Sequence, residues 1–416
     1  MPALSGRPVR TRAARRGRLW AVSSLRVLES DASLPQVRTA IAEAFAGGPP
    51  VAPLPADPVA APRVLAMLQP DQPVVEPDAA VIVSTSGSTG QAKGVVLSRT
   101  AITASAEATH LRLAGPGHWL LALPTHYVAG FMVVARATVS GTPVNEVGRD
   151  LAELPETLLR IDQPSYLSLV PTQLSRALKV PRLRTALQRV SSILLGGAPA
   201  RPQLLDRCRE LGIPVVTTYG MSETCGGCVY DGEPLPGVGV ELAEEDSTGV
   251  GRILLGGPVA FSGYRLQPEL TASTLIQDHG GATSSGAMVR TNDRGRLVDG
   301  RLAVLGRFDD VIVCGGMKID LAAVERAARD WPALGSGEIV MLGVPDPQWG
   351  TRLVAYAEGG ADATTDLAAL QDFLAGQLAR HELPKELIMM PRLPRTSSGK
   401  VDRQRLLAEA SGEAAQ

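Results

Sequence analysis

The sequence predicts an α/β protein with a large N-terminal domain of layered sheets and helices and a small α+β C-terminal domain. The chain has 416 residues, more than the roughly 250–300 residues over which a single core usually grows. Short runs rich in β-forming residues alternate with helical patterns along most of this length. The texture then changes near GRFDD, residues 306–310, and a compact final segment follows.

The alternation is clearest between residues 80 and 260. The predicted strands are VIVS (81–84), WLLALP (119–124), SYLSLVP (165–171), SSILLGG (191–197), PVVTTYG (214–220) and GRILLGG (251–257). A helical pattern occupies residues 203–211, between two of these strands, and two more, 321–330 and 367–381, lie in the final segment. Helices between strands favour helices packed on largely parallel sheets. We therefore expect a basic, disordered extension over 1–20, a first domain over 21–308 and a second over 309–416.

Composition excludes several classes of protein. The formal net charge is -1, so the protein has no strong positive electrostatic field to attract nucleic acid. Hydrophobic residues make up 44% of the chain, a composition that suits a cytoplasmic enzyme. The most apolar stretch, residues 118–139, contains Pro124, His126 and Arg136. We expect a strand, a loop and a buried helix there, with no membrane insertion. A homodimer is one option that the sequence leaves open.

Four cysteines fit a reducing compartment. Cys225 and Cys228 form a C-x-x-C pair, which suits either a redox or zinc half-site or two structural thiols. The sequence has no second pair and no suitably spaced histidine, so structural thiols are favoured.

The segment STSGSTGQAKG, residues 84–94, follows the apolar run AAVIV. Glycines let backbone N–H groups converge on an anion, hydroxyls add donors, and Lys93 adds a positive charge. The pattern differs from G-x-x-x-x-G-K-[ST], because two residues separate Gly90 from Lys93 and Gly94 replaces the hydroxyl that binds magnesium. A polyphosphate loop of another nucleotide-using class is indicated, with a solvated linker as the alternative.

Five further stretches carry chemistry. ILLGGAP, 193–199, is a strand that runs into a Gly-Gly turn, and VTTYGMSET, 216–224, ends a strand with an aromatic residue, a hydroxyl and a carboxylate. RTNDRG, 290–295, is expected to present Asp293 in a turn. Arg307 lies at the expected domain junction, and Lys400 lies in a polar loop before a helix.

In this order and spacing, the six stretches resemble the acyl-adenylate-forming superfamily of acyl-CoA synthetases, luciferases and adenylation domains over residues 75–410. The resemblance implies ATP and Mg²⁺ as cofactors, CoA as co-substrate and a mobile C-terminal domain that rotates about Asp309. It implies that Lys400, Lys93 and Ser222 act on phosphates and carboxylate, and that Glu223 holds the metal. The implied nucleotide contacts are Thr85, Ser86, Gly87, Ser88, Thr89, Gly90, Gly197, Ala198, Pro199, Thr218, Tyr219, Gly220, Asp293 and Arg307.

Two departures from the superfamily pattern are present. Ala92 stands where proline is common, and Asn292 stands where the usual motif, T-G-D, has glycine. The aspartate of that motif is retained as Asp293, so we expect the ribose contact to be kept.

The stretches around TTYGMSETCGGC and LPTHYVAGFMVVARA resemble the o-succinylbenzoate-CoA ligases of menaquinone biosynthesis, in the compact actinobacterial form. That substrate has two carboxylates, so a cation is expected for the one that is not activated. Arg136 is the candidate, with the backbone of Gly226 and Gly227 as the alternative, and His126 is expected at the acyl pocket. A ligase for another aryl or fatty acid, and an inactive binding homologue, are the alternatives.

Overall fold

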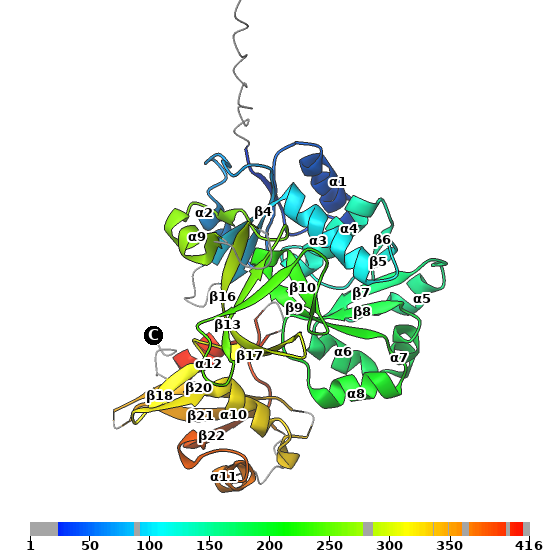
Figure 1. The fold of residues 1–416 in the computed structure, drawn as a ribbon. Helices are drawn as coiled ribbons and strands as arrows, with labels where there is room; N and C mark the ends of the chain where they lie inside the picture. Colours follow the sequence, from blue (N-terminus) through cyan, green and yellow to red (C-terminus); the bar gives the residue numbers. More distant parts are fainter. Residues whose placement is uncertain are drawn as a thin grey trace, which may run out of the picture.

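The computed structural model describes residues 24–86, 92–277, 286–335, 337–347, 349–359, 366–396 and 400–410. The chain forms a large part, which carries the strands up to β17, and a smaller part below it that begins with β18 (Figure 1). The expected basic extension over 1–20 lies outside the described residues.

A seven-stranded sheet forms the centre of the large part. Its order is β11-β10-β9-β8-β7-β5-β6, and the run from β9 to β6 is parallel. The strands are β5 (His118–Leu121), β6 (Val144–Glu146), β7 (Ser165–Leu169), β8 (Ser192–Leu195), β9 (Val215–Met221), β10 (Gly226–Tyr230) and β11 (Glu233–Pro234). The apolar runs at 119–124, 165–171, 191–197 and 214–220 therefore form neighbouring strands, as their alternation with helices predicts.

A second sheet has the order β1-β2-β3-β4-β14. Its first three strands are parallel, and β4 and β14 run antiparallel to their neighbours. The strands are β1 (Arg26–Leu28), β2 (Val51–Pro53), β3 (Ala79–Ser86), β4 (Ala92–Ser98) and β14 (Gly263–Tyr264). The edge strand β14 joins β4 although the two are far apart in sequence.

Helices fill the space between the two sheets and cover the outer face of the seven-stranded one. Buried residues of α1 (Leu34–Phe45), α3 (Arg99–Arg112) and α4 (Val128–Ser140) form one core with both sheets. On the other face lie α5 (Leu154–Leu158), α6 (Pro171–Leu178), α7 (Pro181–Leu187) and α8 (Pro202–Glu210). Two more helices, α2 (Ala60–Leu68) and α9 (Pro268–Thr274), complete the large part. Residues 118–139 thus form β5, a loop and the buried helix α4, as expected.

A third, antiparallel sheet corrects two expectations. It contains β12 (Gly239–Ala243), β13 (Gly251–Gly256), β15 (Leu275–Gln277), β16 (Ala287–Val298) and β17 (Arg301–Arg307). GRILLGG is thus β13 of this sheet and does not belong to the parallel one. Asp293 was expected in a turn, but it lies inside β16, because β16 is paired on both sides by β13 and β17.

The smaller part has its own core. A hairpin of β18 (Val311–Cys314) and β19 (Met317–Asp320) precedes a sheet of β20 (Ile339–Asp346), β21 (Gly350–Glu358) and β22 (Glu386–Met390). The helices are α10 (Leu321–Ala328), α11 (Leu367–Ala375) and α12 (Arg403–Ala410). The helix expected over 367–381 ends at Ala375, next to Gly376.

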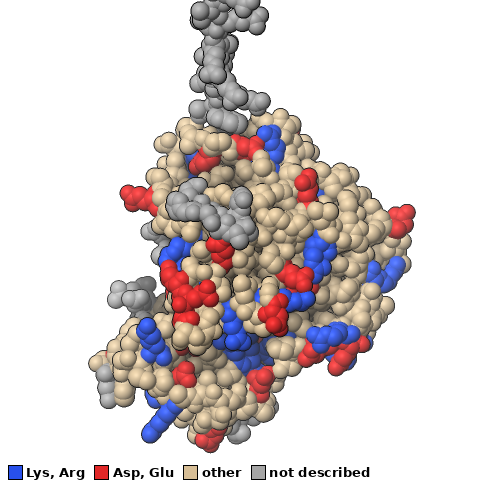
Figure 2. Space-filling view, in the orientation of Figure 1, with Lys and Arg blue, Asp and Glu red and all other residues tan. Residues whose placement is uncertain are grey.

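Polar contacts join the two parts. Arg294 of β16 pairs with Asp320 at the start of α10, and Arg201 donates to the carbonyl of Gly337. Figure 2 shows Lys and Arg side chains gathered where the large part meets the smaller one. The boundary predicted near residue 308 falls between β17 and β18.

Candidate active site

The predicted ribose-binding aspartate lies in a polar corner formed by β9, β16 and β17. The Tyr219 hydroxyl donates a hydrogen bond of 2.7 Å to Oδ2 of Asp293, which is 9% exposed. Arg307 lies opposite Asp293 in the β16–β17 register, and its Nη1 is 3.6 Å from Oδ1. A phenol and a guanidinium thus orient an acceptor for paired hydroxyl groups. Burial and the neighbouring Asp293 charge raise the pKa of Tyr219, so the phenol stays protonated and remains a donor.

Lys400 approaches this corner from the smaller part. The backbone N–H of Thr396 donates to the carbonyl of Lys400 at 2.8 Å, and Arg395 forms a β-bridge with Val401, so Lys400 lies beside Thr396. Lys400 keeps contact with solvent. Partial desolvation and then the charge of Arg307 lower the pKa of Lys400, while Asp293 opposes them. The lysine predicted from the sequence is therefore close enough to interact electrostatically with both residues of the ribose corner.

The predicted metal-binding carboxylate has a partner that the sequence did not indicate. Glu223 lies in a short 3₁₀ turn, Ser222–Thr224, directly after β9. The Tyr264 hydroxyl donates to Oε1 of Glu223 at 2.7 Å, and Nζ of Lys93 lies 5.7 Å from the centroid of the Tyr264 ring. Tyr264 reaches this place because β14 pairs with β4, where Tyr264 is opposite Val95. No local motif could signal such a pairing.

The predicted phosphate loop connects β3 to β4. β3 ends at Ser86, and the register places Thr85 opposite Lys93 and Ser86 opposite Ala92. Gly87, Ser88, Thr89, Gly90 and Gln91 lie outside the described residues. The loop therefore starts and ends on two paired strands, with Lys93 at its exit.

The predicted adenine-side residues follow β8 and lie on β9. Gly197 has φ +80°, a conformation that L side chains rarely adopt, so the turn before Ala198 and Pro199 requires glycine. Thr218 and Gly220 lie on β9, beside the hairpin strand β10. A Cβ on Gly220 would lie 2.2 Å from the carbonyl oxygen of Gly226, which explains the small residues here.

The two predicted acyl-pocket residues lie in different surroundings. His126 lines a cavity of about 460 Å³ at the carboxyl ends of β1, β2, β5 and β6, and Arg136 is not among the lining residues. Burial, followed by the charge of Arg149, lowers the pKa of His126 to about 4, so the ring is neutral at pH 7. Its Nε2 is buried without a hydrogen-bond partner among the described residues.

Arg136 lies within the core on α4. It is 3% exposed, and its guanidinium carbon is 5.1 Å from the centroid of the Trp119 ring. Its Nε has no hydrogen-bond partner in the described part of the chain. Burial and the Arg136 charge lower the pKa of His110 to about 4, which keeps a second cation from forming beside it. Gly226 faces the same helix, since a Cβ there would be 3.9 Å from Met132 and 4.0 Å from Val128.

Cys225 and Cys228 are free and fully buried. Burial raises the pKa of both thiols, to about 12 for Cys228. Within the described ranges, no group of three or more His, Cys, Asp or Glu side chains could hold a metal ion. The C-x-x-C pair thus contributes two protonated thiols to the core in this structure.

Comparisons with known proteins define the class. Residues 19–265 match the AMP-binding enzyme family, and residues 334–400 match the AMP-binding enzyme C-terminal domain. The chain belongs to the AMP-binding enzyme family, and the fold predicted from the sequence is confirmed.

Particular relatives are more specific. A probable 2-succinylbenzoate–CoA ligase of Mycobacterium tuberculosis is 39% identical over 353 residues, which is 82% of this chain and 87% of the relative. The 2-succinylbenzoate–CoA ligase of Listeria monocytogenes is 31% identical over 79% of this chain and 69% of its own length.

Solved structures support the fold. ATP-bound MatB from Rhodopseudomonas palustris has a TM-score of 0.80 at 22% identity and covers 94% of this chain and 89% of its own. The o-succinylbenzoate CoA synthetase MenE from Bacillus subtilis, in complex with OSB-AMP, has a TM-score of 0.71 at 23% identity, over 92% and 88% of the two chains. No described helix is both long and apolar enough to cross a membrane.

Proposed function

We propose that this chain is an AMP-forming acid-CoA ligase that converts 2-succinylbenzoate to 2-succinylbenzoyl-CoA. The observation that carries the proposal is the corner in which Tyr219 and Arg307 hold the Asp293 carboxylate, with Lys400 of the smaller part within electrostatic range of Asp293 and Arg307. A lysine from the smaller part beside a ribose acceptor of the large part is the arrangement that adenylation requires. The relatives from M. tuberculosis and L. monocytogenes support the choice of acid.

The first half-reaction forms an acyl-adenylate. A carboxylate oxygen of the acid attacks the α-phosphorus of ATP, the bond from that phosphorus to the bridging oxygen breaks, and pyrophosphate leaves. Asp293 holds the ribose hydroxyls, with Tyr219 and Arg307 orienting its two oxygens. Lys400 offsets the negative charge where carboxylate meets phosphate, and Lys93 offsets charge on the leaving group.

Glu223 fits a magnesium site. Mg²⁺ in nucleotide enzymes is commonly held by one or two carboxylates together with substrate phosphates and water, so a single glutamate after β9 suffices. When bound, the ion would neutralise charge on the departing pyrophosphate. The chain's own contribution is to hold the Glu223 carboxylate in one direction through the Tyr264 hydroxyl.

The second half-reaction is attack of the CoA thiolate on the acyl carbonyl, with loss of AMP. We propose that the smaller part rotates about Asp309, so that Lys400 leaves and the thiol enters. Asp309 lies between β17 and β18 and accepts two hydrogen bonds from Arg307, of 2.8 and 2.9 Å. The ion pair of Arg294 with Asp320 crosses this junction and separates during such a rotation.

Arg136 is the proposed cation for the second carboxylate of the acid. An arginine that is 3% exposed, with its Nε unpaired in the described ranges, is costly to bury unless an anion meets it. His126, whose ring is neutral and lines the cavity, is proposed to contact the rest of the acid.

Turnover over a panel of acids tests the substrate. We expect acid-dependent pyrophosphate exchange to be fastest with 2-succinylbenzoate. A preference for a long-chain or simple aryl acid would favour another ligase of the family, and no exchange with any acid would indicate a binding-only homologue.

We expect Tyr264→Phe to raise the magnesium concentration that pyrophosphate exchange requires by about tenfold, because Glu223 loses a charge-assisted bond of about 1.5–3 kcal/mol. The phenylalanine ring keeps its contact with Phe261, whose centroid is 4.9 Å away. Tyr230→Phe is the control, since its hydroxyl contacts Thr109 away from Glu223. Equal magnesium dependence in the two variants would contradict the role of Tyr264.

We expect Asp309→Pro to leave pyrophosphate exchange largely intact and to slow thioester formation by about tenfold or more. Proline fixes φ near -65° and disfavours helical backbone at the preceding residue, which restricts rotation at the junction. Asp309→Ala controls for loss of the carboxylate, and single-turnover measurements of the two half-reactions report the difference. Unchanged thioester formation in the proline variant would place the pivot elsewhere.

A further inference from the structure

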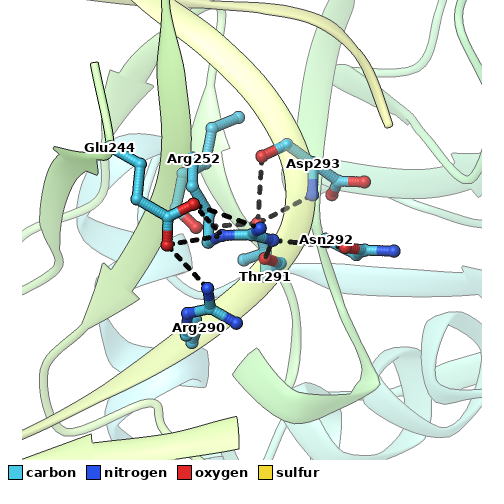
Figure 3. Close-up of polar contacts among 7 residues, drawn as sticks. Glu244, Arg252, Arg290, Thr291, Asn292 and Asp293 are labelled. Carbon is cyan, nitrogen blue, oxygen red and sulfur yellow. Dashed lines mark hydrogen bonds and ion pairs between the residues drawn. The ribbon is translucent and has the colours of Figure 1, made fainter. Parts of the chain in front are cut away.

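Arg252 of β13 is held by four different groups. Its guanidinium pairs with Glu244 at 3.4 Å and donates to the carbonyl of Thr291 at 3.0 Å and to Oδ1 of Asn292 at 3.2 Å. Figure 3 shows it between the Glu244 carboxylate and the backbone that leads into Asp293. The side chain is only 11% exposed. Such a planar, multiply bonded guanidinium has one preferred position.

The fourth group is the aromatic ring of Phe308. The guanidinium carbon of Arg252 lies 4.1 Å from the ring centroid, within the range of a cation–π contact. The backbone N–H of Phe308 donates to the carbonyl of Asn292 at 2.9 Å. Arg252 therefore contacts β16 at the residue before Asp293 and, directly after the end of β17, the residue before Asp309.

We propose that Arg252 is a positioning residue that fixes, as one unit, the backbone carrying Asp293 and the aromatic residue from which the smaller part pivots. The proposal rests on the proposed nucleotide site and hinge, and it goes beyond them by assigning their alignment to a side chain that is not among the proposed nucleotide and acid contacts.

The location of each contact supports this assignment. All four Arg252 contacts lie before residue 309, within the large part, so they persist when the smaller part rotates. Arg294, whose guanidinium is 6.0 Å from the same ring, pairs instead with Asp320 across the junction. Arg252 thus keeps its contacts at the pivot during the proposed rotation, whereas the ion pair of Arg294 with Asp320 separates.

Asn292, which replaces the glycine of the T-G-D pattern, takes part in the Arg252 contacts. Its side-chain oxygen is an acceptor for Arg252 that glycine lacks. Burial raises the pKa of Asp309, but hydrogen bonds from Arg307 and, to a smaller extent, from the Asn292 side chain outweigh burial and lower it. The asparagine therefore interacts with groups on both sides of the corner.

Two variants test the proposal in the full chain. Arg252→Met keeps much of the length and removes every donor, and Arg252→Lys keeps the charge beside Glu244 but loses the planar fork. The matched control is Arg290→Met, because Arg290 donates to the same Glu244 at 2.6 Å without contacting Phe308. AMP affinity by calorimetry is expected to fall about tenfold for Arg252→Met, less for Arg252→Lys, and less than about twofold for Arg290→Met.

The second readout is tryptic cleavage after Arg307, followed as the fragment that begins at Phe308. Cleavage requires local opening of this segment. We expect it to be about fivefold to tenfold faster in Arg252→Met and unchanged in Arg290→Met, because a lost charge-assisted contact raises the open population by this order. Phe308→Leu should have a similar effect, and combining it with Arg252→Met should add little, as for two groups in direct contact.

AMP affinity within about twofold of the parent in both Arg252 variants, or cleavage after Arg307 as slow as in the parent, would overturn the proposal. If Arg252→Met does not fold, the same two outcomes are judged on Arg252→Lys. Neither readout uses an acid. A parent protein that binds AMP but does not activate 2-succinylbenzoate would therefore disprove the proposed substrate and leave the test of Arg252 valid.

Discussion

Lys400→Ala is expected to lower the rate of acyl-AMP formation by roughly 10²- to 10³-fold, the usual cost of removing a group aimed at developing charge. The lysine is close enough to the Asp293–Arg307 corner for both to affect its pKa, which fits the proposed position of its ammonium where carboxylate and α-phosphate meet. Acid-dependent pyrophosphate exchange measures this step.

Thioester formation from supplied acyl-AMP should change little in the same variant, because the proposed rotation moves Lys400 away before the thiol attacks. Lys385→Ala, an exposed lysine of the smaller part, is the control for charge and folding. Equal losses in both half-reactions would contradict the rotation about Asp309.

Arg136→Met is expected to raise KM for 2-succinylbenzoate by about tenfold to a thousandfold, which corresponds to a lost charge-assisted bond of about 1.5–3 kcal/mol plus part of the desolvation penalty. KM for ATP should hardly change, because the proposed nucleotide contacts lie between β3 and β4, after β8, and on β9, β16 and β17, and none lies on α4. Methionine is chosen because Arg136 is buried against Trp119, and alanine would also leave a cavity.

An analogue without the second carboxylate supplies the control. It should bind the parent poorly and lose little further affinity in Arg136→Met, the non-additivity expected of two groups in contact. Arg149→Met is the matched variant, since Arg149 lines the cavity beside His126. A larger effect in Arg149→Met would move the second carboxylate from the core to that cavity.

Local sequence specified the elements and much of the site's chemistry. The apolar runs before Gly196, Tyr219 and the phosphate loop form strands β8, β9 and β3. Short runs of β-forming residues that are bounded by glycine favour strands, so these elements could be predicted locally. Asp293 could also be predicted from the sequence as a hydrogen-bond acceptor, but its position within strand β16 could not. Whether β16 would be interrupted at Asp293 depended on two partner strands, which no local window contains.

The sequence by itself determined the class of fold, and it predicted the strand before the proposed phosphate loop and the charged residues proposed for a nucleotide and an acid. Only the tertiary structure decided which side chains meet: Tyr219 with Asp293, Tyr264 with Glu223, and Arg252 with both Asn292 and Phe308. It also decided that Arg136 is buried. The physical reason is that propensity and periodicity act over one or two turns of chain, whereas these contacts depend on pairing between strands that are distant in sequence.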